Sequence, residues 1–181
     1  MQPRGGRKLY NGNSREKGSE EVLRKGGIRN KGVPPGNRGE HKVSRKLSVH
    51  IDGSSLGNPG PGGAGVLITD ERGRVLCEMS VPLGIVTNNQ AEYRALLEAL
   101  RWLAEQGASG EVEILTDSKL LYEQVSGRYR LRNPELARLM ESARALMSGL
   151  NVSFTLVERG ENSRADLLAR KAAKGIGKGE R

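Results

Sequence analysis

The sequence contains little cysteine and no long apolar run. Cys77 is the single cysteine of its 181 residues, so no intramolecular disulfide can form, and we expect a reducing, cytoplasmic setting. No apolar stretch is long enough to span a bilayer, and the N-terminus lacks the short apolar segment of a secretory signal. These absences argue against a membrane protein and favour a soluble monomer with room for one ordinary domain and an appendage.

Excess positive charge is confined to the first quarter of the chain. The formal net charge is +9, and residues 1–46 supply all of it, with thirteen Lys or Arg against four Glu, while residues 47–181 hold seventeen of each sign. The basic segment also has nine glycines, three prolines and few apolar residues, too few to offset the entropy of ordering. We therefore predict a disordered N-terminal arm over residues 1–46, which is either a tether to nucleic-acid phosphates or a solvated tail.

From Leu47 onward, apolar runs alternate with turn signals, which marks a domain boundary. This alternation predicts strands over residues 47–52, 63–69, 73–81, 111–116 and 151–158. Cap residues and apolar stripes predict helices from the TNNQ segment to Gly107, over residues 118–127, from Pro134 and from Ser163. The order predicts an α/β fold with a mixed five-stranded sheet, in which an antiparallel three-strand meander joins two parallel strands and helices cover both faces. The first and fourth strands are expected to be parallel neighbours.

An acid stands at the predicted end of two strands. Asp52 ends the first strand within the stretch HIDGSSLGNPGPGGAG, and Asp117 ends the fourth strand. Both acids also have an ordinary structural explanation. Asp52 precedes Gly and Ser, a sequence that is common in turns, and Asp117, the Asp of TDSK, can cap the helix that follows it. Neither acid identifies a site when it is taken alone.

Two more acids lie near predicted helix starts. Glu92 follows Asn89 by three residues, so a capping box is its structural alternative. On a helical projection, however, Glu92 points into the apolar stripe formed by Ala95, Leu96, Ala99 and Leu103. A carboxylate there is costly to bury unless a metal ion or a distant Arg balances it. Asp166 repeats the ambiguity, because Ser163 and Asp166 have the spacing of a capping box.

The predicted topology brings the four acids toward one edge of the sheet. In mixed α/β sheets, ligands bind at the carboxyl ends of the central strands, where two of these acids lie. Hard oxygen ligands gathered in one place suit Mg²⁺, with Mn²⁺ as a substitute. Two such ions about 4 Å apart activate a water molecule and stabilise the leaving oxygen of a phosphodiester.

Four segments resemble the motif blocks of the type 1 ribonuclease H family, in family order and with similar intervals. They are IDGSSLGNPGPGGAGVLI, TNNQAEYRALLEAL, LTDSKLL and ENSRADLLARKA. The resemblance implies a ribonuclease H-like fold, with a catalytic domain over residues 47–181 and a core that ends at about residue 174. It also implies endonucleolytic hydrolysis of the RNA strand in an RNA/DNA hybrid, leaving a 3′-hydroxyl and a 5′-phosphate.

The same resemblance assigns site residues. The family's metal-binding catalytic acids match Asp52, Glu92, Asp117 and Asp166. Positions that contact the hybrid match Gly53, Ser54, Ser55, Asn58, Asn88 and Asn89. Glu92 is implied to lie near the 2′-hydroxyl of the attacked strand, the group that distinguishes RNA from DNA. The glycines after Asp52 are interpreted as a loop whose backbone approaches the nucleic-acid backbone closely.

The chain departs from the family in the loop before the last acid. Many relatives carry a His there, whereas this loop reads VERGENS. Arg159 or Glu161 can take part of that role, and the alternative for both is a solvated surface charge. His50 shares a strand face with Asp52, and we expect a packed, hydrogen-bonded side chain at this position.

Two other functions stay open beside the hybrid nuclease. One is a nuclease of the same fold with broader specificity, which also cuts double-stranded RNA. The other is a non-catalytic nucleic-acid-binding module, although clustered negative charge gives no advantage to a protein that only binds phosphates. The glycine-rich stretch does not indicate a P-loop, because it lacks the Gly-Lys-Ser/Thr ending.

Overall fold

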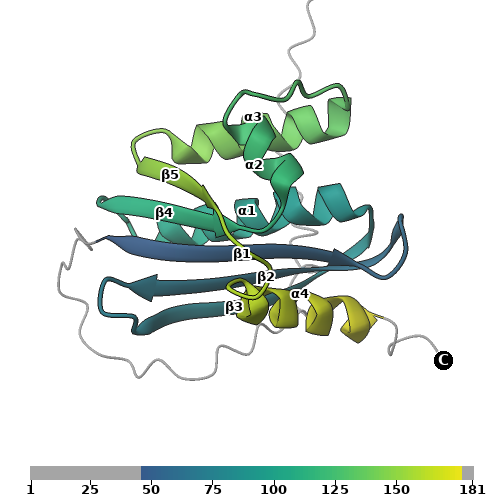
Figure 1. Ribbon diagram of the computed structural model, residues 1–181, viewed down its shortest axis with the longest axis horizontal. Helices are drawn as coiled ribbons and strands as arrows, with labels where there is room; N and C mark the ends of the chain where they lie inside the picture. The colour runs from purple at the N-terminus through teal and green to yellow at the C-terminus, as the bar shows by residue number, and fades with distance from the viewer. Residues whose placement is uncertain (1–45, 177–181) are drawn as a thin grey trace, which may run out of the picture. The chain divides into compact units, whose positions relative to one another are not determined.

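Five strands form one mixed sheet in the order β3-β2-β1-β4-β5 (Figure 1). The computed structural model describes residues 46–176. The strands are β1 (Leu47–Ser55), β2 (Gly60–Asp70), β3 (Val75–Val86), β4 (Glu111–Thr116) and β5 (Asn151–Leu156). Strands β1, β2 and β3 pair antiparallel, while β4 pairs parallel with β1 and β5 parallel with β4. The predicted meander and the two parallel strands are confirmed, whereas the predicted arm lies outside the described residues except for Lys46.

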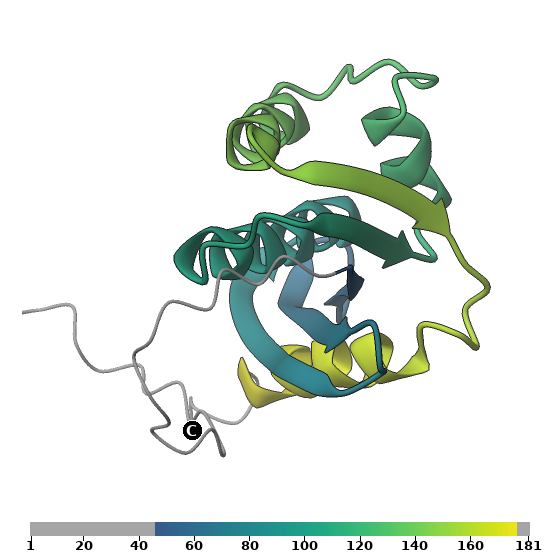
Figure 2. The same ribbon diagram turned by 90° about the vertical axis from the view of Figure 1, so that its left-hand side faces the viewer.

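Four helices cover the sheet. They are α1 (Asn88–Glu105), α2 (Lys119–Val125), α3 (Pro134–Met147) and α4 (Ser163–Ile176). Helix α1 lies on one face of β1 and β2, with α3 packed beside it, and α4 lies on the opposite face (Figures 1 and 2). Helices on both faces are therefore confirmed. None of the helices within residues 46–176 combines the length and apolar character that crossing a membrane requires.

The core between β1 and α1 follows directly from the two periodicities of the sequence. Alternate residues of β1 point to the same face, and Leu47, Val49 and Ile51 are all buried. The predicted apolar stripe of α1, which comprises Ala95, Leu96, Ala99 and Leu103, is also buried, and Leu100 is buried with it. Burial of these side chains fixes α1 against the sheet, because each large aliphatic side chain contributes roughly 1.5–3 kcal/mol when it leaves water.

The glycine-rich stretch forms strands rather than a long loop. Strand β1 continues three residues beyond Asp52 to Ser55, and β2 begins at Gly60. The antiparallel ladder of β1 and β2 begins at the pair Leu47–Asp70 and continues past Asp52–Gly65 to the pair Ser55–Gly62. The expectation that Asp52 ends its strand is therefore wrong, because glycine depletion in strands is only a statistical tendency that tertiary packing overrides.

At three glycines of this hairpin, the backbone of a helix packs directly against the strand. A Cβ atom on Gly53 would overlap the α1 backbone at Ala91 and Glu92. A Cβ atom on Gly63 or Gly65 would overlap the α4 backbone in the same way. Helices from both faces of the sheet occupy the space beside these glycines, so close packing of the helices accounts for the absence of side chains at these positions.

Substitution of Gly65 by Ala is expected to destabilise the domain strongly. The new Cβ would overlap the carbonyl oxygen of Ala165 in α4, and backbone cannot move aside as a flexible side chain does. We expect the free energy of unfolding to fall by about 3 kcal/mol, the upper part of the range for overpacked cores. Gly175→Ala is the matched control, because nothing lies within 4 Å of its Cβ position. Equal urea midpoints for the two variants would contradict this account of Gly65.

Candidate active site

Asp52 and Asp117 lie where strands β1 and β4 separate. The parallel pairing of these strands ends at His50 and Leu115, whereas β1 stays paired with β2 as far as Ser55. Asp52 is thus held in a paired strand and is only 5% exposed. Asp117 directly follows the last residue of β4. Both acids therefore lie just beyond the last parallel β1–β4 pair, although only Asp117 follows the end of its strand.

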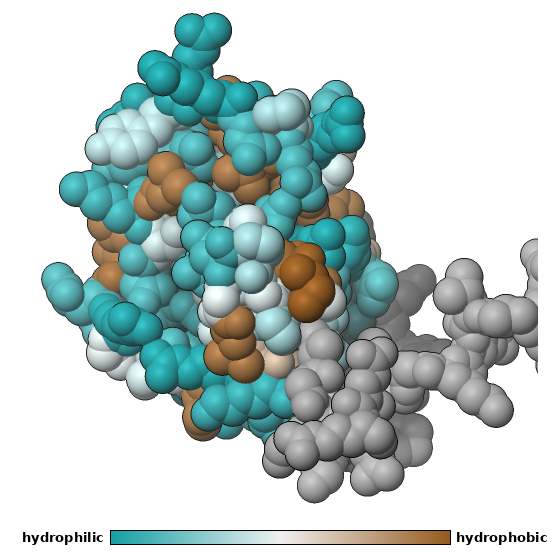
Figure 3. All heavy atoms as spheres, turned by 90° about the vertical axis from the view of Figure 1, so that its right-hand side faces the viewer, coloured by the Kyte–Doolittle hydropathy of each residue, from teal (hydrophilic) through white to brown (hydrophobic). Residues whose placement is uncertain are grey.

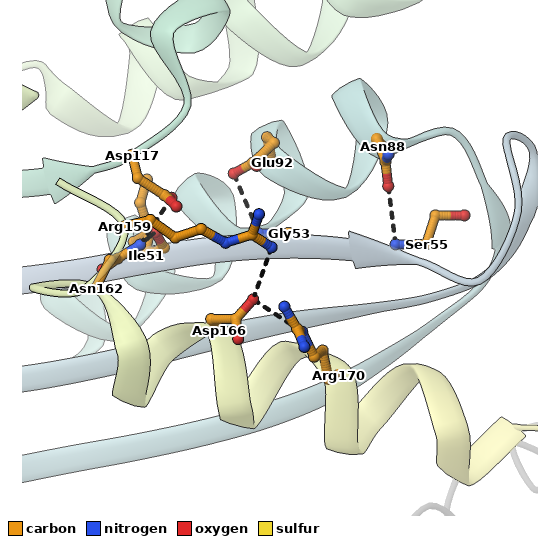
Figure 4. A network of polar contacts seen from close by, with 10 residues as sticks. All are labelled: Ile51, Gly53, Ser55, Asn88, Glu92, Asp117, Arg159, Asn162, Asp166 and Arg170. Atoms are coloured by element: carbon orange, nitrogen blue, oxygen red, sulfur yellow. Dashed lines mark hydrogen bonds and ion pairs between the residues drawn. The ribbon is translucent and has the colours of Figure 1, made fainter. Parts of the chain in front are cut away.

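Glu92 and Asp166 reach the same region from helices on opposite faces of the sheet (Figure 4). The Glu92 carboxylate accepts a hydrogen bond from the backbone N–H of Gly53 at 3.1 Å. Asp166 lies in the first turn of α4, and its Oδ1 is 2.9 Å from Arg170 Nε and 3.7 Å from Arg159 Nη2. The Asp166 carboxylate therefore forms ion pairs with these two arginines and does not form the capping box that its spacing from Ser163 allowed.

The helix caps are made by other residues. Thr87 is the N-cap of α1, and it forms a reciprocal capping box with Gln90. Ser118 is the N-cap of α2, where its hydroxyl accepts a hydrogen bond from the backbone of the first turn. The capping alternatives for Glu92 and Asp117 are therefore wrong. Their carboxylates remain available for chemistry.

A cleft of about 350 Å³ opens over the four carboxylates. The rest of its lining consists of small or uncharged polar residues and two arginines, namely Gly53, Ser54, Ser55, Asn88, Asn89, Ser118, Arg159 and Arg170. Most of the predicted site residues, which come from segments far apart in the sequence, thus share one cavity.

The uncharged side of the cleft is a connected hydrogen-bonded platform. The backbone N–H of Ser55 donates to Asn88 Oδ1 at 3.0 Å, and the backbone N–H of Asn88 donates to Asn58 Oδ1 at 3.1 Å. Asn58 is absent from the lining of the cleft, so its place is behind Asn88 rather than beside the four acids. The platform fixes the start of α1 against the hairpin.

Arg159 and Glu161, the two candidates from the loop before Asp166, have different places in the structure. Arg159 lines the cleft, and its side chain is 74% exposed. Glu161 does not line the cleft, and its carboxylate accepts a hydrogen bond from the backbone N–H of Glu158 at 3.1 Å. His50 is packed and hydrogen-bonded as predicted, because its Nδ1 lies 3.3 Å from Asn162 Oδ1.

Two residues of the site were missed by sequence reasoning. Arg170 lines the cleft, and its spacing of four residues from Asp166 on one helix was an available signal. Asn162 is 1% exposed and donates hydrogen bonds to the Ile51 carbonyl and to Asp117. No local pattern in the sequence indicates contacts of such long range.

Burial and mutual repulsion shift the acids toward their protonated forms. Burial, followed by the charges of Asp117 and Asp166, raises the pKa of Asp52 from 3.8 to about 7, against the opposing effect of Arg159 and Arg170. Burial, followed by the charges of Asp52 and Asp117, raises the pKa of Glu92 well above its ordinary value. The cluster therefore carries more negative charge than its protein surroundings compensate.

The donor set suits a hard divalent cation. All four charged ligand candidates are carboxylates, and the raised pKa values of Asp52 and Glu92 show that a nearby cation would stabilise the ionised forms of these two side chains. Within residues 46–176, no three His, Cys, Asp or Glu side chains are arranged closely enough to hold a metal ion as they stand. Asp166 faces Arg170 and Arg159 through its Oδ1, so a cation bound at this oxygen would compete with the two guanidinium groups.

Comparison with known proteins identifies relatives over most of the described domain. A family model described as reverse transcriptase-like matches residues 50–172. The chain is 41% identical over 129 residues to the bifunctional protein Rv2228c of Mycobacterium tuberculosis, a match that covers 70% of this chain and 35% of that protein. It is 38% identical over 128 residues to Ribonuclease HI of Halobacterium salinarum, covering 70% of this chain and 64% of that protein. The chain thus spans only part of the length of both relatives.

Solved structures agree with the sequence relatives. The N-terminal RNase H domain of Rv2228c superimposes with a TM-score of 0.68 at 40% identity, covering 71% of this chain and 98% of that one. LC11-RNase H1, solved in complex with an RNA/DNA hybrid, gives a TM-score of 0.69 at 36% identity, covering 72% and 98%. Fold and sequence together define a ribonuclease H-like domain. The chain belongs to the type 1 ribonuclease H family.

The raised pKa of Asp52 predicts a stability that depends on pH. An acid whose pKa is raised by folding does not lower the free energy of unfolding at pH values below its unfolded pKa near 4. It lowers the free energy of unfolding most at pH values above its folded pKa of about 7. Asp52→Asn removes this charge, so we expect the metal-free variant to gain up to about 4 kcal/mol of unfolding free energy at pH 8 and little at pH 4.

Urea unfolding in EDTA at both pH values measures this effect. Glu141→Gln, an exposed change on α3, serves as the control and is expected to show no comparable difference between the two pH values. A gain for Asp52→Asn that is the same at pH 4 and pH 8 would show that charge repulsion is not its cause.

Proposed function

We propose that this domain is a metal-dependent endonuclease that hydrolyses the RNA strand of RNA/DNA hybrids and leaves a 3′-hydroxyl and a 5′-phosphate. The observation that carries the proposal is the convergence of four carboxylates, from β1, the β4–α2 junction, α1 and α4, on one polar cleft. The capping roles that would explain two of these acids otherwise are taken by Thr87 and Ser118. A module that only bound phosphates would gain nothing from such clustered negative charge.

Mg²⁺ is the proposed cofactor, with Mn²⁺ as a substitute, and its ligands would be Asp52, Glu92, Asp117 and Asp166. Two bound ions would supply an activated water and would neutralise the leaving oxygen of the phosphodiester. The protein holds Asp52 on a paired strand and Glu92 on a helix anchored by the core, which limits the movement of both ligands. Rigid placement of this kind is what catalytic groups require.

The hydrogen-bonded platform beside the acids is the proposed binding surface for the hybrid. Backbone groups of residues 53–55 and the side chains of Asn88 and Asn89 line the cleft, while Asn58 supports Asn88 from behind. Glu92 joins this platform through its hydrogen bond with Gly53, and its carboxylate is proposed to lie near the 2′-hydroxyl of the attacked RNA strand. The exposed Arg159 guanidinium is proposed to contact a phosphate near the cleft.

The surface of the domain suits a polar partner. On the side shown in Figure 3, the described surface is mainly hydrophilic, and apolar side chains lie scattered among polar ones. The relative LC11-RNase H1 was solved with an RNA/DNA hybrid, which supports the same substrate for this chain. Activity on double-stranded RNA remains the alternative, and the assay below separates the two.

A cleavage assay tests the proposal. With Mg²⁺ or Mn²⁺, we expect the protein to cut the RNA strand of a hybrid, and we expect EDTA to abolish cutting. Asp52→Asn is expected to reduce kcat by at least about 100-fold, because it removes a charged ligand from the cluster. The exposed Glu141→Gln serves as the matched control and should retain full activity.

The same assay separates the remaining functions. Double-stranded RNA and double-stranded DNA are tested in parallel, and cutting of double-stranded RNA would establish the broader specificity. No metal-dependent cutting of the hybrid, or undiminished cutting by Asp52→Asn, would overturn the proposed function. End labelling of the fragments checks the 3′-hydroxyl and the 5′-phosphate.

The basic arm is proposed to add electrostatic affinity for nucleic acid. Residues 1–45 should be deleted rather than 1–46, because Lys46 pairs with Glu113 at 3.4 Å beside the start of β1. We expect weaker hybrid binding and a shallower dependence of log K on log salt, by about one for each lost phosphate contact, with kcat nearly unchanged. Fluorescence anisotropy at several salt concentrations measures this slope, and an equal slope for both chains would show that the arm does not bind.

Two further expectations accompany this function. We propose a monomer in the cytoplasm, and the observation that supports a reducing setting is the free thiol of Cys77, partly buried on β3. Analytical ultracentrifugation of the full chain tests the oligomeric state.

A further inference from the structure

Asn162 is a buried polar residue at the junction between the loop after β5 and helix α4. Its side chain is 1% exposed, although asparagine is normally found at the surface. A buried amide is costly unless its donors and acceptor are all paired. The contacts of Asn162 therefore show what this position is built to hold.

The side-chain amide of Asn162 contacts three groups, and Figure 4 shows two of them, Ile51 and Asp117. Its Nδ2 donates to the backbone carbonyl of Ile51 at 2.8 Å and to Asp117 Oδ1 at 3.1 Å. Its Oδ1 lies 3.3 Å from His50 Nδ1, which donates to it. A carbonyl and a carboxylate only accept hydrogen bonds, so the two contacts use both N–H groups of the Asn162 amide as donors.

The backbone of Asn162 adds a fourth connection. Its carbonyl oxygen accepts a hydrogen bond from the backbone N–H of Asp166 at 3.1 Å, the first such bond of α4. Asn162 thus contacts Asp117 directly, contacts the peptide that precedes Asp52, and sets the start of the helix that carries Asp166. Glu92 is anchored separately, through Gly53.

We propose that Asn162 is a positioning residue that holds three of the four acids in register for cation binding and catalysis. This inference rests on the proposed function. The charge-assisted bond to Asp117 fixes the rotamer of that carboxylate and offsets part of the repulsion from its neighbours. The bond to Ile51 ties β1 to the loop before α4, so that Asp52 and Asp166 keep a fixed separation.

Asn162→Asp and Asn162→Ser test the proposal. Both Asp and Ser are good helix N-caps, so the start of α4 remains supported. Asp keeps the shape of Asn but replaces the two N–H donors by an acceptor that faces Asp117, and Ser is too short to reach. We expect either change to lower kcat for hybrid cleavage by about 10- to 100-fold, with KM within about twofold.

Metal binding is measured independently of catalysis. Calorimetric titration with Mn²⁺ is expected to show affinity weakened by about 10-fold in both Asn162 variants. Ser80→Ala is the matched control, because the Ser80 hydroxyl donates to the Leu168 carbonyl at 2.8 Å and so ties α4 to β3 without touching an acid. It should retain the Mn²⁺ affinity and the kcat of the unmodified chain. All variants are compared at a temperature at which circular dichroism shows them folded.

The outcomes separate this inference from the proposed function. Asn162→Asp with the Mn²⁺ affinity and kcat of the unmodified chain would overturn the positioning role. Equal losses in Ser80→Ala would also overturn it, because general loosening of α4 would then explain them. An unmodified chain that cuts no hybrid would overturn the function, and the Mn²⁺ titrations would still decide whether Asn162 positions the acids.

Discussion

Burial of Asp52 and Glu92 beside the charges of neighbouring acids is the constraint that the rest of the domain has to satisfy. Burial and neighbouring charge raise the pKa of Asp52 and of Glu92, so both groups are held where their ionised forms are unfavourable. The acids do not escape into water, because they are carried by separate elements whose positions depend on apolar packing away from the cleft. Stability of the core thus sustains a local arrangement that charge alone would disperse.

Close contact between the helices and the hairpin links the fold to the site. Gly53 allows the α1 backbone to approach β1, and the same contact lets its N–H reach the Glu92 carboxylate. Gly65, the partner of Asp52 in the ladder, admits α4 at Ala165, the residue next to Asp166. Larger residues at either glycine would move a helix outward and take its acid away from the cleft.

Much of the architecture could be predicted from local patterns. The order of the elements, the parallel pairing of β1 with β4 and the place of Asp117 after β4 all follow from strand alternation, helix caps and connection rules. The extent of the hairpin could not be predicted, because a run rich in glycine resembles a loop unless the helices that need the space are known. Arg170 had a usable signal in its spacing from Asp166, whereas Asn162 had none.

By itself, the sequence determined the kinds of elements, their order and the four acidic positions, since periodicity, turn chemistry and motif spacing are local properties of a chain. Only the tertiary structure decided that these acids share one cleft, that Thr87 and Ser118 cap the helices in their place, and that Asn162 connects them. The physical reason is that hydrogen bonds and repulsion act over a few ångströms of space. Residues that meet beside this cleft, such as Ile51 and Asn162, whose hydrogen bond is buried, are 111 positions apart in the chain.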